Sequence, residues 1–417
     1  MRGPDRQTIA FGLASGVAAV GTLALGADAA LPSYAGGLAM SLAALVAGGR
    51  APLPLAFWLG AGTTAWLLGR AALTGGLWLA GPELAAMAGI AGAFAVGVQA
   101  GAETQRARRA ASLLTATLAG LAVLAFAAHV ASPDAVLGRP KPYHQGRLTG
   151  TFLSANTAAT VCGLGLALGL AGLARAVRGA GGVLRGLEAA GRRGLAPGVL
   201  TLFSATCLLL TGSRAGLLAG AFGALVVLAP RRARGVRLPA LLGAVAACAL
   251  LLAASGGVLG DRLADVGAGA SGRGALWSAS LEAWREAPWL GHGLGSFPRA
   301  LAPHVTAWTA PVLSVQGAAH DLPLQWLVQA GVVGTSMGAA TLAALGRTLA
   351  SGLARRRRGR WILRAGLGGL AVFGLHGLVD YALEVPAASW WLALLTGLAA
   401  GVAGGGTPAG ERRAAPR

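Results

Sequence analysis

Three arginines and one histidine lie in or beside the connections between apolar segments on the side that has few basic residues, so their presence there asks for a reason. They occur in Gly-Arg147-Leu-Thr-Gly, Thr-Gly-Ser-Arg214-Ala-Gly, Gly-Arg273-Gly-Ala-Leu-Trp and Ala-Ala-His320-Asp-Leu-Pro. A guanidinium keeps its charge and binds phosphate oxygens through two parallel hydrogen bonds. A histidine at a helix N-terminus is favoured in its neutral form, which accepts a proton. The set predicts a base beside a clamp for an anionic, phosphate-bearing substrate.

Each of these residues also has an ordinary structural explanation. Arg147 and Arg214 could be interfacial arginines whose charged ends reach the lipid headgroups. Arg273 could pair with an acidic neighbour such as Glu282, and His320 could stand at a helix end with no task. Singly these alternatives stay open, but the four residues together favour the chemical interpretation.

An amphipathic helix is expected around Arg273. The segment from Gly272 to Glu286 has helical periodicity, and Pro288 would end it. At 100° per residue, Arg273 shares one face with a tryptophan-rich set. That set is Trp277, Ser280, Leu281 and Trp284. We therefore expect Arg273 to open this helix and to face away from bulk solvent.

A second polar group lies further along the chain. His376 and Asp380 are spaced i, i+4 near the end of the predicted span 361–381, and Glu384 follows. Ionisable residues within a span are candidates for function. The two could equally form a structural hydrogen-bonded pair that closes the bundle. The outer connections contain no paired-carboxylate signature, so we expect neither a metal ion nor a cofactor.

The composition is that of a membrane protein. Of 417 residues, 55% are hydrophobic and 12% are charged, whereas soluble domains carry about 25% charged residues. The net charge of +20 could suggest a polyanion partner. However, the arginines form short clusters between apolar segments of about 20 residues, the length of a membrane span. The charge therefore indicates topology, and we expect no nucleic-acid partner.

The apolar segments predict an all-α polytopic membrane protein with about twelve spans, rich in the small residues that allow close helix packing. The spans are expected near 8–27, 35–49, 53–73, 83–101, 110–131, 150–172, 195–211, 214–230, 238–257, 321–347, 361–381 and 387–405. A long outer loop, 258–320, would hold the short amphipathic helix. The chain then has four units. Residues 1–131 and 132–257 are two groups of membrane helices, 258–320 is the outer loop, and 321–417 contains the last membrane helices and the basic tail.

The distribution of arginine also predicts orientation. Connections rich in Arg and Lys remain in the cytoplasm, and the rich ones here all fall on one side of a twelve-span arrangement. Both termini are then cytoplasmic. The outward-facing residues are Arg147, Arg214, Arg273 and His320. Met1–Ala30 could be mistaken for a signal peptide, but we expect a retained first helix. The cysteines, Cys162, Cys207 and Cys248, lie in apolar runs without CxxC spacing and suit helix packing.

These motifs resemble the O-antigen ligase and Wzy-type polymerase superfamily of bacterial membrane glycan transferases, from about Gly146 to the last span. The specific part is Gly-Arg273-Gly-Ala-Leu-Trp, then Ala-Pro-Trp-Leu-Gly-His-Gly-Leu-Gly-Ser-Phe, His320 and Gln329-Ala-Gly. The resemblance implies that Arg214 and Arg273 contact a lipid-linked diphosphate and that His320 is the base. Asp321 stands where the family usually has asparagine. Arg147 and Asn156 match a looser region, Gly-x-Phe-x-x-x-Asn.

The reaction that the resemblance implies moves a glycan from undecaprenyl diphosphate to a hydroxyl group of a glycolipid, glycan or protein, at the outer face of the bacterial inner membrane. The hydroxyl oxygen would attack the anomeric carbon while the diphosphate leaves. A base near the acceptor and positive charge on the leaving group would lower the barrier. Besides membrane lipids, the partners are this donor and this acceptor.

Two other classes of protein remain possible from the residues alone. A transporter or flippase for an anionic or lipid-linked substrate could also have many helices and an anion-binding mouth, although transporters usually place broken helices and polar groups near the midplane. A scaffolding membrane protein is the second alternative. Within the superfamily, ligase, polymerase and protein O-oligosaccharyltransferase share these motifs.

Overall fold

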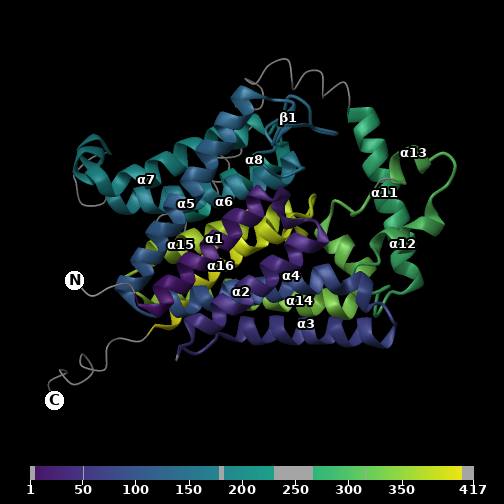
Figure 1. Ribbon diagram of the computed structural model, residues 1–417, viewed down its shortest axis with the longest axis horizontal. Coiled ribbons are helices and arrows are strands. Elements are labelled where there is room, and N and C mark those ends of the chain that lie inside the picture. The colour runs from purple at the N-terminus through teal and green to yellow at the C-terminus, as the bar shows by residue number, and fades with distance from the viewer. Residues whose placement is uncertain (1–4, 50, 178–182, 230–265, 315, 406–417) are drawn as a thin grey trace.

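The computed structural model describes residues 5–49, 51–177, 183–229, 266–314 and 316–405, and in these ranges the chain is almost entirely helical (Figure 1). The first half contains α1 (Arg6–Leu23), η1 (Leu25–Ala27), α2 (Ala30–Ala47), α3 (Leu55–Leu73), α4 (Leu77–Gly101), α5 (Thr104–Ala131), the antiparallel strands β1 (Ala135–Val136) and β2 (Arg139–Pro140), α6 (Ala155–Ala176), α7 (Val183–Leu210) and α8 (Arg214–Leu228). The second half contains α11 (Val266–Glu286), α12 (Phe297–Leu301), η3 (Ala302–His304), α13 (Ala310–Leu313), α14 (Leu322–Arg355), α15 (Arg360–His376), η4 (Ala382–Glu384) and α16 (Pro386–Gly404).

Seven helices of the described residues are long and apolar enough to cross a membrane. They are α2, α4, α5, α6, Arg193–Leu210 of α7, α14 and α16. α1, α3, α8 and α15 cover four more of the predicted spans. The predicted span 238–257 lies outside the described residues, as does Cys248. The prediction of a polytopic helical membrane protein is confirmed, whereas the number twelve stays a prediction.

α16 forms the centre of the bundle. Figure 1 shows it between one group of helices, α5 to α8 with α15, and a second group, α2 to α4 with α14. Its tryptophans Trp390 and Trp391 are fully buried. Small residues let it approach its neighbours closely, because a β-carbon at Gly97 of α4 would lie 2.7 Å from the Leu394 carbonyl oxygen. The abundant glycine therefore serves close packing, as the sequence indicated.

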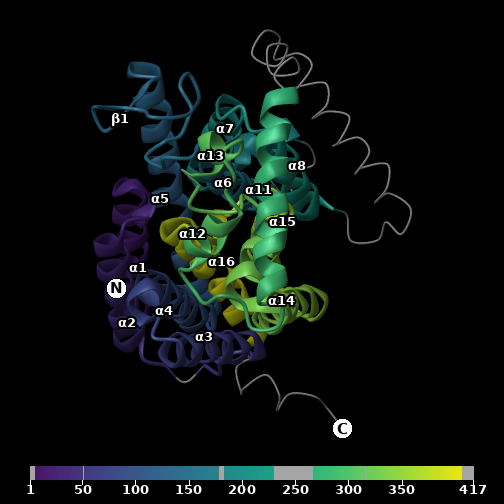
Figure 2. The same cartoon turned by 90° about the vertical axis from the view of Figure 1, so that its right-hand side faces the viewer.

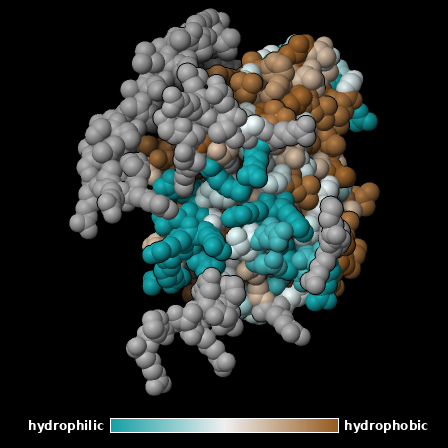
Figure 3. Space-filling view, turned by 90° about the vertical axis from the view of Figure 1, so that its left-hand side faces the viewer, coloured by the Kyte–Doolittle hydropathy of each residue, from teal (hydrophilic) through white to brown (hydrophobic). Residues whose placement is uncertain are grey.

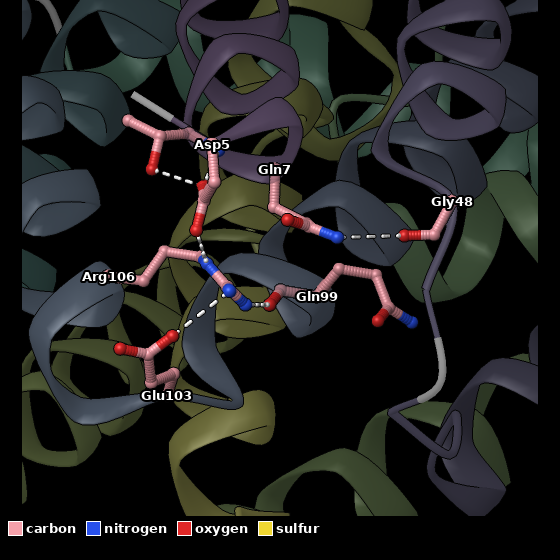
Figure 4. Close-up of polar contacts among 7 residues, drawn as sticks. Asp5, Gln7, Gly48, Gln99, Glu103 and Arg106 are labelled. Carbon is pink, nitrogen blue, oxygen red and sulfur yellow. Dashed lines mark hydrogen bonds and ion pairs between the residues drawn. The ribbon is translucent and has the colours of Figure 1, made fainter. Parts of the chain in front are cut away.

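The bundle has two polar ends of different character. At one, which we call the Arg106 end, Arg106 binds Asp5, Glu103 and the Gln99 backbone (Figure 4). Figure 3 views the molecule from this side and shows the hydrophilic side chains gathered there. The opposite end, which we call the His320 end, contains the starts of α6, α8, α14 and α16 and the end of α15. The segments α11 to α13 lie beyond it (Figures 1 and 2).

The helix that carries Arg273 differs from the prediction in its start and in its buried face. It begins at Val266, so Arg273 lies inside it and does not open it. The buried face consists of Leu276, Ala279, Ser280 and Ala283. Leu276, Ala279 and Ala283 pack against α12, the α13 segment and α14, and Trp277 and Trp284 flank this contact. Arg273 is exposed, so the expectation that it faces away from solvent is wrong.

Candidate functional site

Two glycine-rich motifs, distant in sequence, form one unit at the His320 end. α14 is broken at Gly331, whose φ of 63° and ψ of −173° are not helical. The segment after α11 occupies the break, where His292 N–H donates to the Val328 carbonyl and Gly293 N–H to the Gln329 carbonyl, both at 2.9 Å. A β-carbon at Gly331 would collide with the Trp289 backbone. This unit fixes the first half of α14, which begins two residues after His320.

His320 is held in an unusual backbone conformation. Its φ is 52°, in the left-handed region that non-glycine residues avoid at a cost of about 1 kcal/mol or more. The next residue, Asp321, caps α14 by accepting the Leu324 N–H at 2.8 Å, and Leu322 N–H donates to the Gly377 carbonyl at 2.8 Å. Asp321 thus makes a cap bond that asparagine could also make. Burial raises the pKa of Asp321, although the Leu324 N–H opposes this.

The carboxylate of Asp380 lies beside His320. Asp380 is fully buried, and its Oδ1 lies 3.9 Å from His320 Nδ1. Within the described ranges neither Asp380 oxygen has a hydrogen-bond partner, and neither does His320 Nδ1. A buried carboxylate without partners is expensive. Catalytic hydrogen bonds are often long before substrate binds, and closure of this gap would put the proton on Nδ1 and leave Nε2 as the proton acceptor.

A hydrogen-bonded pair of His376 and Asp380, one of the two alternatives that the sequence left open, is not formed, because neither Asp380 oxygen has a hydrogen-bond partner among the described residues. α15 ends at His376, so Asp380 lies in the following turn and not one helical turn along the same face. His376 Nδ1 instead lies 2.6 Å from the Thr160 hydroxyl, which donates in turn to the Asn156 carbonyl at 3.2 Å. Asn156 stands in the first turn of α6. The two residues thus remain at the His320 end, with different partners from those expected.

The Arg147 and Arg214 motifs meet each other. Arg147 Nε donates to the Thr211 carbonyl at 2.6 Å, and Leu148 N–H donates to the Leu210 carbonyl at 2.9 Å. The loop that contains β1 and β2 is therefore attached to the turn between α7 and α8. Part of the Arg147 guanidinium is used to hold this turn, a structural role that the sequence did not indicate.

The turn itself explains why Arg214 is followed by Ala-Gly. Ser213 caps α8 by accepting the Gly216 N–H at 3.2 Å, and Arg214 is the first residue of the helix, half-buried. A β-carbon at Gly216 would lie 2.5 Å from the β-carbon of Ala159 in α6. Only glycine lets α8 approach α6 this closely. The approach places the start of α8 beside the stretch of α6 that contains Thr160.

Arg273 reaches the same end from α11. It lies close enough to His376 for an electrostatic interaction between the two side chains. Glu282, one of its possible acidic neighbours, is paired with Arg285 instead. The structure therefore brings Arg273, His376, Asp380 and His320 to one end of the bundle, from three separate segments of the chain.

Three residues at this end were missed from the sequence, namely Thr160, Gln325 and Tyr381. Tyr381 packs edge-on against His320 with ring centres 4.9 Å apart, and burial together with nearby carboxylates raises its pKa. Its hydroxyl therefore stays protonated. No local pattern signals Thr160 or Tyr381, because their partners lie far away in the chain. The described residues contain no group of three or more His, Cys, Asp or Glu that could hold a metal ion.

Comparison with known families agrees with the motifs. Residues 199–337 match the model of the O-antigen ligase family. The O-antigen ligase match contains Arg214, Arg273, His320 and the α14 break, so the resemblance to the O-antigen ligase and Wzy-type superfamily is confirmed. Arg147, Asn156, His376 and Asp380 lie outside the matched residues. No curated protein matches the chain.

Proposed function

We propose that the chain is a membrane glycan transferase of the O-antigen ligase or polymerase type. It would move an oligo- or polysaccharide from undecaprenyl diphosphate to a hydroxyl acceptor at the periplasmic face of the bacterial inner membrane, with both termini in the cytoplasm. The observation that carries the proposal is His320, which lies in the O-antigen ligase match beside a buried carboxylate without partners.

In the proposed reaction His320 is the general base. The acceptor hydroxyl oxygen bonds to the anomeric carbon, the bond from that carbon to the diphosphate oxygen breaks, and the lipid diphosphate leaves with the electron pair. His320 Nε2 takes the hydroxyl proton, and Asp380 stabilises the imidazolium that forms. A positioned base contributes about 10² to 10⁴-fold to such a reaction.

The arginines would hold the leaving group. Arg214 stands at the first position of α8, where the free N–H groups of the helix also favour an anion. Arg273 approaches from α11 and carries the second positive charge. Arg147 fixes the α7–α8 turn and so positions Arg214, while Asn156 and His376 line the same end. Arg214 and Arg273 would compensate the charge of the leaving diphosphate, and the proposed reaction is metal-independent.

The transporter alternative finds partial support in the break of α14 at Gly331, since transporters use broken helices. Here, however, the backbone of Pro288–Gly293 fills the break and bonds its freed groups. A filled break leaves no path for a substrate at this point. Protein in liposomes discriminates the two functions, because a transporter moves the lipid-linked glycan unchanged and a transferase alters it.

The experiment that tests the proposal is complementation of a deletion strain, read as a glycolipid profile. Wild-type chain should restore the mature glycan and His320→Ala, at equal protein level in the membrane, should not. A lost ligase leaves long glycan on the carrier lipid, a lost polymerase leaves single repeat units, and a lost protein glycosyltransferase reduces the mass of a secreted protein. Full restoration by His320→Ala would contradict the role of His320.

A further inference from the structure

Ala319, the residue before His320, has both of its backbone polar groups bonded to side chains, which come from two different helices. The N–H of Ala319 donates to Gln325 Oε1 at 2.7 Å, and the carbonyl of Ala319 accepts from Trp277 Nε1 at 3.1 Å. Ala319 is fully buried and Gln325 is 2% exposed. Gln325 belongs to the first turn of α14 and Trp277 to α11. Both backbone groups of Ala319 are therefore satisfied by side chains and neither by secondary structure.

This arrangement acts directly on His320. A left-handed histidine reverts to a common backbone conformation unless the residues around it are fixed. The Asp321 cap fixes the chain after His320, and the bonds at Ala319 fix the chain before it. Loss of either bond at Ala319 frees the rotation that carries the imidazole away from Asp380.

The orientation of Gln325 is itself defined. Its Oε1 accepts from the Ala319 N–H, so its Nε2 is directed the other way, and Glu384 lies close enough for its side chain to interact with Gln325. A flipped amide would turn its NH2 group toward the Ala319 N–H and place two donors against each other. The bond to Ala319 therefore favours the observed orientation.

Trp277 links the base to the helix that carries Arg273. Arg273 and Trp277 are one helical turn apart on α11, so their side chains lie on the same side of this helix. The helix that would hold the diphosphate thus also holds the peptide before His320. A shift of α11 would move both together.

We propose that Gln325 and Trp277 are positioning residues, which hold the Ala319 peptide so that His320 keeps its left-handed conformation and directs Nδ1 at Asp380. This inference rests on the proposed transferase function. Neither residue would touch substrate, so their effect would fall on the catalytic step and not on binding of the donor.

The test is steady-state transfer by the purified full chain with a lipid-diphosphate-linked glycan and an acceptor. Gln325→Met and Trp277→Phe each remove one hydrogen bond and keep the bulk of the side chain. We expect kcat to fall about tenfold, the KM for the donor to stay within about twofold, and the pH profile of kcat to change. Trp277→Phe is the more conservative of the two variants, so it still tests the positioning role if Gln325→Met fails to fold.

Two matched controls use the same residue types. Trp284→Phe removes the bond from Trp284 Nε1 to the Pro288 carbonyl, two turns further along α11. Gln99→Met removes a glutamine that clamps the Ala51 peptide at the Arg106 end. Both controls lose a comparable bond away from His320, so their kcat should stay within about twofold of wild type.

A double substitution separates positioning from general packing. With His320→Ala already present, Gln325→Met and Trp277→Phe should cause no further loss, because residues that act through one group are not additive. A further tenfold loss there, a raised KM with unchanged kcat, or equal effects of Trp277→Phe and Trp284→Phe would overturn the inference. Wild-type chain that transfers nothing would instead contradict the proposed function.

Discussion

The two ends of the bundle treat their polar side chains differently. At the Arg106 end, Arg106 binds Asp5 at 2.8 Å and Glu103 at 3.0 Å, and Gln99 holds the Ala51 peptide by both its N–H and its carbonyl (Figure 4). At the His320 end, both oxygens of Asp380 and one ring nitrogen each of His320 and His376 have no hydrogen-bond partner in the part of the chain that the structure describes.

The difference distinguishes polar side chains that stabilise the fold from those that we propose to act on a substrate. More than 90% of buried polar groups in proteins are hydrogen-bonded, so a cluster of exceptions asks for a reason. Backbone strain is also concentrated at functional sites, and His320 carries it. The hydrogen-bonded polar groups of the Arg106 end hold helices together. The polar atoms without hydrogen-bond partners and the strained His320 agree with the substrate site that we propose at the His320 end.

The largest effect is expected for Asp380→Asn. Asparagine keeps the shape but cannot stabilise the imidazolium, so transfer should fall by at least about 100-fold. Removal of a buried charge without partners should leave the melting temperature in detergent unchanged or raise it. Transfer assays and thermal unfolding of the same preparation measure both. Retained activity, or a large fall in melting temperature, would contradict the assignment.

A smaller effect is expected for Arg214→Lys. Lysine keeps the positive charge but loses the planar fork that binds two phosphate oxygens. Transfer should therefore fall about tenfold, measured as kcat/KM for the donor. A near-normal kcat/KM would contradict a bidentate contact between Arg214 and phosphate, and would indicate that only a positive charge is needed at this position.

At the other end, Arg106→Gln should affect stability and not transfer. Arg106 is partly buried and its partners Asp5 and Glu103 are half-exposed, so the loss should be about 1 kcal/mol or less. Thermal unfolding should show this shift, while transfer per folded molecule stays at the wild-type value. A loss of transfer beyond the loss of folded protein would break the contrast between the two ends.

The smallest effect is expected for Asp321→Asn. Burial raises the pKa of Asp321, so the folded chain binds this proton more tightly than the unfolded chain does. The stability contribution of Asp321 is present at low pH and is lost as pH rises through the folded pKa. Asparagine keeps the cap bond without the charge. The variant should melt slightly higher at neutral pH, and the difference should shrink on acidification; a lower melting temperature at neutral pH would contradict this.

Sequence reasoning succeeded where the determining signal is local. Apolar length located the long helices of the bundle, such as α4, α6 and α16. The Thr-Gly-Ser-Arg-Ala-Gly turn lies between α7 and α8 as expected, and Ser213 caps α8. The partner of Asp380 could not be predicted, because it depends on the end of α15 at His376 and on a contact with a residue 60 positions away. The left-handed φ of His320 and the bond from Trp277 to Ala319 likewise arise from tertiary packing, which periodicity does not encode.

The central claim is that the His320 end performs chemistry on a lipid-linked glycan. The most direct measurement incubates the purified chain in liposomes with a lipid-diphosphate-linked glycan and its acceptor, and follows both by mass spectrometry. The account predicts that glycosylated acceptor and free lipid diphosphate appear together with wild-type chain and are lost with His320→Ala. Donor that remains intact, or that crosses the bilayer unchanged, would contradict it.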